Sequence, residues 1–478
     1  MASRPLAIAL AVWAAAAPAE TAAQGPGWLS RTIAEPPADP PVSDDARPAP
    51  IVVEPLDRPV PDTVGLRDPA AAGLLAALWQ ASPAQTLGRQ LEALGAPRLA
   101  ATQDLLHAML TVTARAPRES RGGEAFFLSR IDALMAAGAF DPARAMMERA
   151  GYDRPEIFRR WFDLALLTGQ EDQACARMRA APRITPTYPA RIFCLARSGD
   201  WPAAAVTLET ARALAVVTPS ETDRMARFLD AYAESAGLPP PDRPTPLDYM
   251  LYEAMGEPLR STSLPLPFAH ADLRRHIGWK ARIAAGERLA RAGGIGPDRL
   301  WEIYREHDPA ASGQPWDRVA AVQALENALA EGDAAAAAEV LPGLWDDMLA
   351  AGLAPVLARQ VADRIAPEAL EGRAATVARD LKRLAAPDPG MPETSGDDPL
   401  GAAIAAGLAG RAATGRGAGL LSEGRTGEAL LYAIELLDLG AQGNLDALRD
   451  GLATLVEAGQ DRTARRAAVE VALTGDGA

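Results

Sequence analysis

The sequence predicts an all-α protein, and two observations support this prediction. Hydrophobic residues make up 49% of the 478 residues but aromatic residues only 5%, so the core is built mainly from alanine and leucine. These two residues are strong helix formers, whereas β-branched and aromatic residues dominate strands. The second observation is a glycine–alanine pattern that occurs six times and has the spacing of amphipathic helices joined by tight turns.

Each copy of the pattern contains a glycine, an alanine five residues later and an apolar residue nine residues later. An apolar pair lies three and four residues before the glycine. This spacing predicts two helices that meet at the glycine, with the small alanine allowing the second helix to approach the first. Stacked hairpins of this kind form an α-solenoid. The glycine–alanine pairs are Gly138/Ala143, Gly169/Ala174, Gly199/Ala204, Gly332/Ala337, Gly424/Ala429 and Gly459/Ala464.

The N-terminus has the pattern of a secretory signal peptide, which we expect to span residues 1–19. Arg4 supplies a positive charge, residues 6–17 form an apolar run too short to cross a membrane, and Ala-Pro-Ala at 17–19 fits a cleavage site. Cleavage after Ala23 and an uncleaved apolar tail are the alternatives. The bias toward alanine, arginine and proline is typical of a high-GC bacterium, so the predicted compartment is the periplasm. The net charge of −14 disfavours nucleic acid and anionic lipid partners.

The rest of the chain divides by composition. Ten prolines between Pro36 and Pro69 predict a linker that cannot bury enough apolar surface to fold alone. Prolines and aromatic residues interrupt the helical repeats in the middle of the chain, and a polar stretch precedes the last repeats. The predicted segments are a disordered linker (20–69), TPR-like helical repeats (70–236), an irregular proline-rich block (237–318), further repeats (319–386), a second linker (387–398) and C-terminal repeats with a cap (399–478).

The two cysteines, Cys175 and Cys194, are predicted to form a disulfide. Prolines near Thr185 mark a break between two helices, and the cysteines lie about equally far from it, so they should face each other across an antiparallel pair. In an oxidising compartment such a crosslink is worth roughly 3 kcal/mol. The alternative is two buried free thiols.

The best repeats resemble tetratricopeptide repeats. Their glycines are spaced 31 and 30 residues apart, close to the ~34-residue period of that family. The resemblance rests on Gly-Ala-Phe-Asp-Pro-Ala at 138–143, Gly-Gln-Glu-Asp-Gln-Ala at 169–174 and Gly-Asp-Trp-Pro-Ala-Ala at 199–204. The small residue of the family's first helix is replaced by Ile131, Phe162 and Ile192. The chain also resembles exported helical-repeat proteins of alphaproteobacteria, and some tetratricopeptide-like periplasmic proteins position flagellar stator components.

The irregular block is predicted to be the partner-binding surface, because an irregular segment rich in aromatic residues is typical of recognition. A joint between two halves of the solenoid is the alternative. The candidate partner-binding residues are Tyr249, Tyr252, Phe268, Trp279, Trp301, Tyr304 and Trp316.

No pattern of residues predicts catalysis, a metal site or a cofactor. His270 and His276 are six residues apart, whereas zinc-binding helices place ligands four apart. The glycines at 415–419 lack the context of a phosphate loop, and Ser312 lacks a nucleophile motif. Glu119 and Ser120 match the start of a lytic transglycosylase motif, but its glycine-rich continuation is absent.

The predicted function is therefore that of a non-catalytic periplasmic scaffold or adaptor that binds other envelope proteins, with flagellar motor components as the first partner class. An accessory factor for envelope assembly or secretion is the alternative of the same kind. A peptidoglycan- or glycan-acting protein with an unrecognised site is the alternative of another class.

Overall fold

The computed structural model describes residues 27–29, 60–120, 123–230, 239–309, 311–390, 398–412 and 414–475. The predicted signal peptide, the linker residues 20–26 and 30–59, and residues 391–397 of the second linker lie outside this description. Within the described residues the regular structure is helical, which confirms the all-α prediction. None of the described helices is long and apolar enough to cross a membrane.

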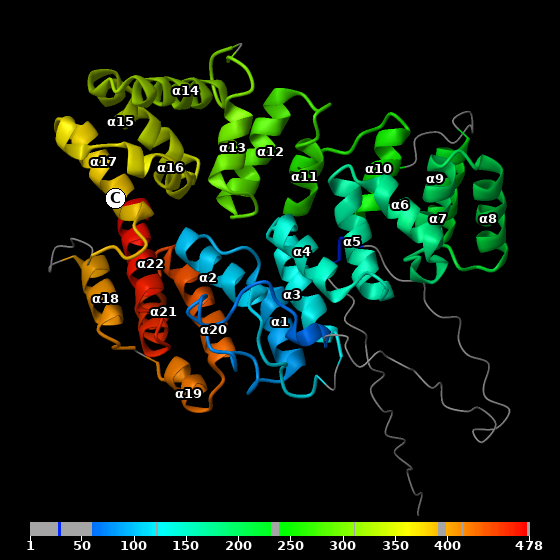
Figure 1. Ribbon diagram of the computed structural model, residues 1–478, viewed down its shortest axis with the longest axis horizontal. Coiled ribbons are helices and arrows are strands. Elements are labelled where there is room, and N and C mark those ends of the chain that lie inside the picture. Colours follow the sequence, from blue (N-terminus) through cyan, green and yellow to red (C-terminus); the bar gives the residue numbers. More distant parts are fainter. Residues whose placement is uncertain are drawn as a thin grey trace, which may run out of the picture.

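The N-terminal half contains nine helices that pack largely in chain order (Figure 1). They are α1 (Ala84–Leu94), α2 (Ala100–Thr111), α3 (Ala125–Ala136), α4 (Phe140–Ala150), α5 (Pro155–Leu167), α6 (Glu171–Ala180), α7 (Tyr188–Arg197), α8 (Trp201–Ala213) and α9 (Pro219–Leu229). The predicted irregular block contains shorter helices. They are α10 (Pro246–Ala254), α11 (Ala269–Asp272), α12 (Trp279–Arg291) and α13 (Pro297–Tyr304).

Two further groups complete the chain. The first is α14 (Trp316–Glu331), α15 (Ala334–Ala350), α16 (Ala354–Val361) and α17 (Gly372–Ala385). The second is α18 (Pro399–Leu408), α19 (Arg416–Ser422), α20 (Thr426–Gly440), α21 (Leu445–Glu457) and α22 (Asp461–Thr474).

All six glycines of the repeated pattern lie at turns between consecutive helices. Their φ values are 73°, 73°, 85°, 70°, 73° and 75°, in the left-handed region that glycine adopts without a steric penalty. The six alanines of the pattern are buried, none more than 5% exposed. The helix–glycine–helix turns predicted from spacing are therefore present in the structure.

Two large hydrophobic cores and a third cluster of three buried residues organise the described residues. The first contains side chains of α1–α10 together with those of α18 and α20–α22, and the second contains side chains of α12–α17. Helix α1 packs on α20, and α2 packs on both α20 and α22. Figure 1 shows the red C-terminal helices between the blue N-terminal helices and the yellow α17. The C-terminal segment, predicted as a separate unit, thus shares a core with the N-terminal half.

Close backbone contact joins these distant segments. The amide of Gly427 in α20 donates to the carbonyl of Leu78 at 3.0 Å, and a β-carbon at Gly427 would overlap the ring of the buried Trp79. Asp104 of α2 accepts hydrogen bonds from Arg359 at 2.7 Å and from Arg466 at 2.6 Å. In a linear array each repeat contacts only its neighbours. Here helices from the two ends of the chain, such as α2 and α22, also contact each other.

The last ten residues of the predicted 20–69 linker are part of the folded protein. Val64 is 5% exposed, and the buried carboxylate of Asp62 accepts hydrogen bonds from Ser120 and, at 2.8 Å, from the amide of Phe127. The amide of Phe127 is one of the first N–H groups of α3, which have no partner within the helix. Asp62 therefore fixes the end of the linker by capping α3 from a distance in sequence.

Candidate protein-binding surface

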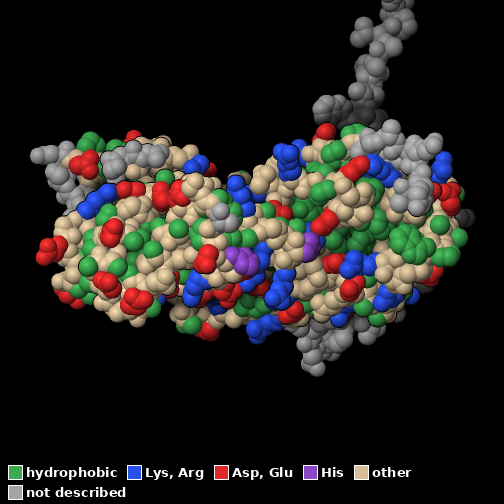
Figure 2. All heavy atoms as spheres, turned by 90° about the horizontal axis from the view of Figure 1, so that it is seen from above, with side chains coloured by type: hydrophobic (Ala, Val, Ile, Leu, Met, Phe, Trp, Pro, Cys, Tyr) green, Lys and Arg blue, Asp and Glu red, His purple; other side chains and the backbone are tan. Residues whose placement is uncertain are grey.

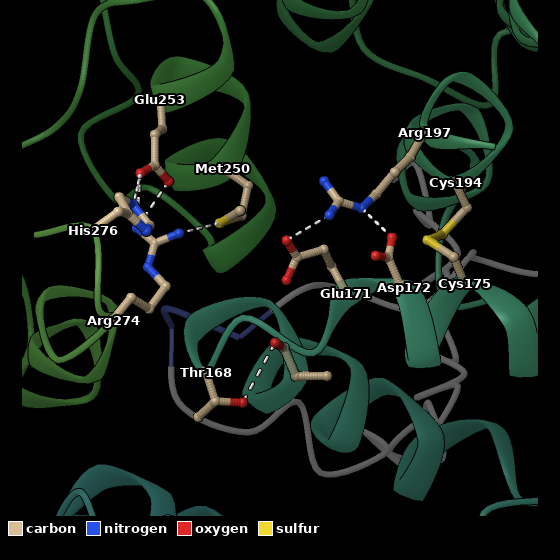
Figure 3. Close-up of polar contacts among 11 residues, drawn as sticks. Thr168, Glu171, Asp172, Cys175, Cys194, Arg197, Met250, Glu253, Arg274 and His276 are labelled. Carbon is tan, nitrogen blue, oxygen red and sulfur yellow. Dashed lines mark hydrogen bonds and ion pairs between the residues drawn. A yellow bond between two sulfur atoms is a disulfide. The ribbon is translucent and has the colours of Figure 1, made fainter. Parts of the chain in front are cut away.

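The predicted disulfide is present between α6 and α7. The Cα atoms of Cys175 and Cys194 are 5.1 Å apart, and both residues are buried. An ion-pair cluster joins the same two helices, because Arg197 of α7 contacts Glu171 at 2.8 Å and Asp172 at 2.6 Å (Figure 3). The crosslink and the ion pairs together hold α7 in register with α6 and provide a fixed support for α8.

The structure distributes six of the seven candidate aromatic residues between two cores, and Tyr252 belongs to neither. Tyr249 and Phe268 belong to the first core, whereas Trp301 and Tyr304 belong to the second. Five side chains are buried, and Trp279 and Trp316 are half-buried with ring centroids 5.1 Å apart. These buried rings are covered by other segments of the same chain. The buried members are Tyr249, Tyr252, Phe268, Trp301 and Tyr304, none more than 4% exposed.

The polar groups of these aromatic residues are paired within the protein. The hydroxyl of Tyr304 donates to Glu287 at 2.8 Å, and Arg318 donates to both oxygens of the same carboxylate at 2.9 Å. Burial, together with the charge of Glu287, raises the pKa of Tyr304 well above its ordinary value. Trp301 Nε1 donates to Glu326 at 3.0 Å. A satisfied buried network of this kind specifies one packing arrangement.

The irregular block makes the contacts of a joint with the N-terminal helices. The ring of His270 stacks on Phe140 with centroids 3.9 Å apart, and its Nε2 lies 2.7 Å from the carbonyl oxygen of Gly138. Because a carbonyl only accepts, Nε2 carries the proton. At Gly294 a β-carbon would lie 2.8 Å from the carbonyl oxygen of Ala137, so the two turns approach backbone to backbone. Burial lowers the pKa of His270 to about 4, which keeps the ring neutral.

Hydrogen bonds within the irregular block also hold the loop before α11 in place. Asp272 accepts hydrogen bonds from Ser261 and, at 3.5 Å, from Tyr249. Arg288 donates to the carbonyl of Ser261 at 2.9 Å and to that of Leu264 at 2.6 Å. His276 lies 3.4 Å from Glu253, a carboxylate that also accepts a hydrogen bond from Arg274 (Figure 3). Among the residues that the structure describes, no three His, Cys, Asp or Glu side chains are grouped as metal ligands.

A polar cavity of about 100 Å³ lies where α2, the loop after α12, the turn before α16 and α22 meet. Three arginines (Arg98, Arg291 and Arg359) line it together with Asp104, His107 and Glu470. Sites for drug-sized ligands measure about 300–1,000 Å³, so this cavity suits water molecules. The arginines and carboxylates that line the cavity also form hydrogen bonds and ion pairs with other groups of the protein. Sequence reasoning missed the cavity because its lining comes from four distant segments.

Four exposed apolar residues lie on α8 and on the turn that follows it. We call this stretch the α8 face and define it by Trp201, Val206, Leu214 and Val216, which are 47%, 67%, 61% and 37% exposed. Trp201 is held in place against Phe228 of α9, with ring centroids 6.1 Å apart. Figure 2 shows hydrophobic side chains at the surface of the end of the molecule that α7, α8 and α9 form.

The α8 face carries a signal that sequence reasoning could have used. In the repeat pattern, Ala204 and Leu208 are the positions that pack inward, and both are buried. Val206 lies two residues from each, on the opposite side of the helix. A valine at a position where the pattern expects a polar residue indicates an apolar outer surface.

No protein-family model, curated protein or solved structure matches this chain.

Proposed function

We propose that this protein is a non-catalytic, exported adaptor whose TPR-like hairpins present the α8 face to another protein of the bacterial envelope. The observation that carries the proposal is the concentration of exposed apolar side chains on one short stretch of the chain. Seven large hydrophobic residues are exposed among those described, and four of them form the α8 face. Apolar side chains scattered singly over a surface are ordinary, but a cluster marks an interaction site.

The composition and support of the α8 face fit protein recognition. Tryptophan is enriched at interaction hot spots, and Trp201 already has its ring ordered by Phe228, so little side-chain entropy is lost when a partner binds. Below the face, the Cys175–Cys194 disulfide and the Arg197 ion pairs restrain α6 and α7. Glu209 and Arg212 pair with each other beside the apolar residues at 4.0 Å. Because this ion pair is exposed on the same helix, the matching partner surface combines apolar side chains with polar groups that face the pair.

The partner class follows from the predicted compartment. An exported adaptor meets envelope proteins, and the resemblance to tetratricopeptide-like periplasmic proteins makes flagellar motor components the first class to test. The proposal rests on analogy for the partner class and on the α8 face for the mode of binding.

Photocrosslinking from the α8 face tests the proposal. A photoreactive amino acid at Val206 is expected to yield a discrete crosslinked species in living cells, whereas the same residue at the isolated, exposed Leu439 is not. Adding Trp201→Ser and Leu214→Ser to the Val206 variant should reduce this species by about ten-fold or more, with an unchanged melting temperature. The matched control is Leu75→Ser, another exposed apolar residue. Equal yields from positions 206 and 439 would contradict the proposal.

A further inference from the structure

Three residues from the predicted linker, Gly27, Trp28 and Leu29, pack against the irregular block. Trp28 is 8% exposed and Leu29 is 2% exposed, so both side chains are buried. The ring of Trp28 meets Phe268 edge to face, with centroids 6.3 Å apart and an interplanar angle of 69°. Figure 1 shows the segment as a short dark-blue trace beside α5. An apolar contact of this size was not expected from a proline-rich segment.

The irregular block itself builds the surface that receives Trp28. We call it the Trp28 site and define it by Phe268, which ends the 3-10 turn Leu266–Phe268, by Tyr249 of α10 and by Arg243 before α10. The rings of Phe268 and Tyr249 are 5.7 Å apart, and the Tyr249 hydroxyl bonds to Asp272. The aromatic wall is therefore held by contacts that do not involve the N-terminal segment.

The shape and charge of the Trp28 site select a short sequence pattern. The aromatic wall of Phe268 and Tyr249 favours an aromatic side chain in edge-to-face contact. The neighbouring Leu29 is more deeply buried still, which requires an aliphatic residue directly after the aromatic one. Arg243 lies beside Gly27, with its Nη1 3.4 Å from the place of a β-carbon, an ordinary contact distance, so alanine fits before the aromatic residue as well as glycine. The pattern is small–aromatic–aliphatic.

The segment has the character of a ligand tethered to its own binding site. Residues 30–59 separate Leu29 from the next described residue and contain many prolines together with Asp, Glu and Ala. A short apolar pair within such a composition is typical of a linear recognition motif. A covalent connection within one chain gives a ligand segment an effective concentration on the order of millimolar, which is enough for weak contacts to form.

We propose that the Trp28 site is a peptide-binding site for a small–aromatic–aliphatic segment and that Gly27, Trp28 and Leu29 are its resident ligand. A segment with the same pattern on another chain competes for the site. This inference is independent of the α8 face, which lies on other helices.

Binding of a peptide in trans to a vacated site tests the inference. The full chain carrying Trp28→Ala and Leu29→Ala is titrated with a fluorescent peptide of residues 24–33. We expect saturable binding to this variant and about ten-fold weaker binding to the wild-type chain, whose site is occupied. The same peptide with Trp28→Ala should not bind. A chain with Leu75→Ala and Leu439→Ala loses exposed apolar side chains elsewhere and should behave like the wild type.

A second experiment keeps every native side chain of the site. A specific protease site inserted between Asp44 and Asp45 allows the tether to be cut after folding. The N-terminal fragment should then remain bound at high protein concentration and be displaced by excess 24–33 peptide, but not by its Trp28→Ala form. Equal peptide binding by the wild-type and vacated chains, no binding to the vacated chain, or a fragment that excess peptide does not displace would each overturn the inference.

Discussion

At the scale of single residues, buried polar side chains act on parts of the chain distant in sequence. Arg130 is fully buried and donates to the carbonyls of Leu110 at 2.8 Å and Val112 at 3.0 Å, the region where α2 ends. His270 satisfies the carbonyl of Gly138 in the same way. The carbonyls at the end of a helix have no partner within it, so such donors stabilise the turn and fix the position of the segment that supplies them.

The buried ring of His270 predicts a loss of stability in acid. Its folded-state pKa of about 4 lies below the ordinary 6.5, so between these values the unfolded chain binds a proton that the folded chain does not. Stability is therefore present above pH 6.5 and is lost as the pH falls toward 4, by at most about 3 kcal/mol.

Chemical denaturation between pH 4 and 7 measures this loss. His270→Gln retains a donor for Gly138 but does not titrate, so its unfolding free energy should fall less steeply with acid than that of the wild type. His270→Phe retains the stacking on Phe140 and should show the same shallower slope at a lower overall stability. A wild-type slope in both variants would show that His270 does not set the pH dependence.

At the scale of helices, α2 depends on a cap from the other end of the chain. Its N-cap position is Leu99, which has no side-chain acceptor. Glu470 of α22 takes that role and accepts hydrogen bonds from the amides of Ala100 at 2.7 Å and Ala101 at 3.0 Å. Burial raises the pKa of Glu470, while these two amides act against the shift. The carboxylate also lies where the helix dipole favours negative charge.

Removing this cap should loosen α2 and its contact with α22. Glu470→Ala leaves two amides without their acceptor and should lower the unfolding free energy by about 1–2 kcal/mol. Glu470→Gln keeps one acceptor oxygen and should cost less. Hydrogen exchange should rise first at the amides of Ala100 and Ala101. Asp461→Ala is the matched control, because Asp461 is an exposed acidic residue at the start of the same helix. Equal effects of Glu470→Ala and Asp461→Ala would exclude the capping role.

The irregular block shows that the sequence reveals where aromatic residues are dense but not that five of the seven candidate side chains are buried. Its short helices meet both cores, with Tyr249 and Phe268 packed in the first and Trp301 and Tyr304 in the second. Density of aromatic residues does not distinguish a joint from a binding surface. The exposure of the side chains does distinguish the two, and Trp201 on α8 is an exposed aromatic residue.

At the scale of the molecule, the packing of the C-terminal helices against the N-terminal helices determines the architecture. The contact between Gly427 and Trp79 lies at this junction, where only a glycine leaves room for the buried ring. A linear array of the same hairpins would not bring these residues together.

A single methyl group therefore tests the junction. Gly427→Ala should lower the unfolding free energy by about 1–3 kcal/mol through overpacking. It should also increase hydrogen exchange in α1 and α20 while α14 and α15 stay protected. Gly343→Ala is the matched control, because Gly343 lies in α15 with no atom within 4 Å of an added β-carbon. That substitution should be neutral or slightly stabilising. If both variants behave alike, α20 does not pack on Trp79 in solution.

The sequence by itself determined what depends on neighbours along the chain. The helical class, the six glycine turns with their buried alanines, and the Cys175–Cys194 pairing all follow from spacings of a few residues to about twenty, where turn geometry and helix period leave few alternatives. Only the tertiary structure decided which distant segments meet. The caps that Asp62 and Glu470 supply, the room that Gly427 leaves for Trp79 and the burial of Trp28 depend on how whole helices pack. Such contacts leave no periodic pattern in the sequence, because in each of them a single side chain pairs with a single group distant along the chain. The same packing leaves the α8 face uncovered.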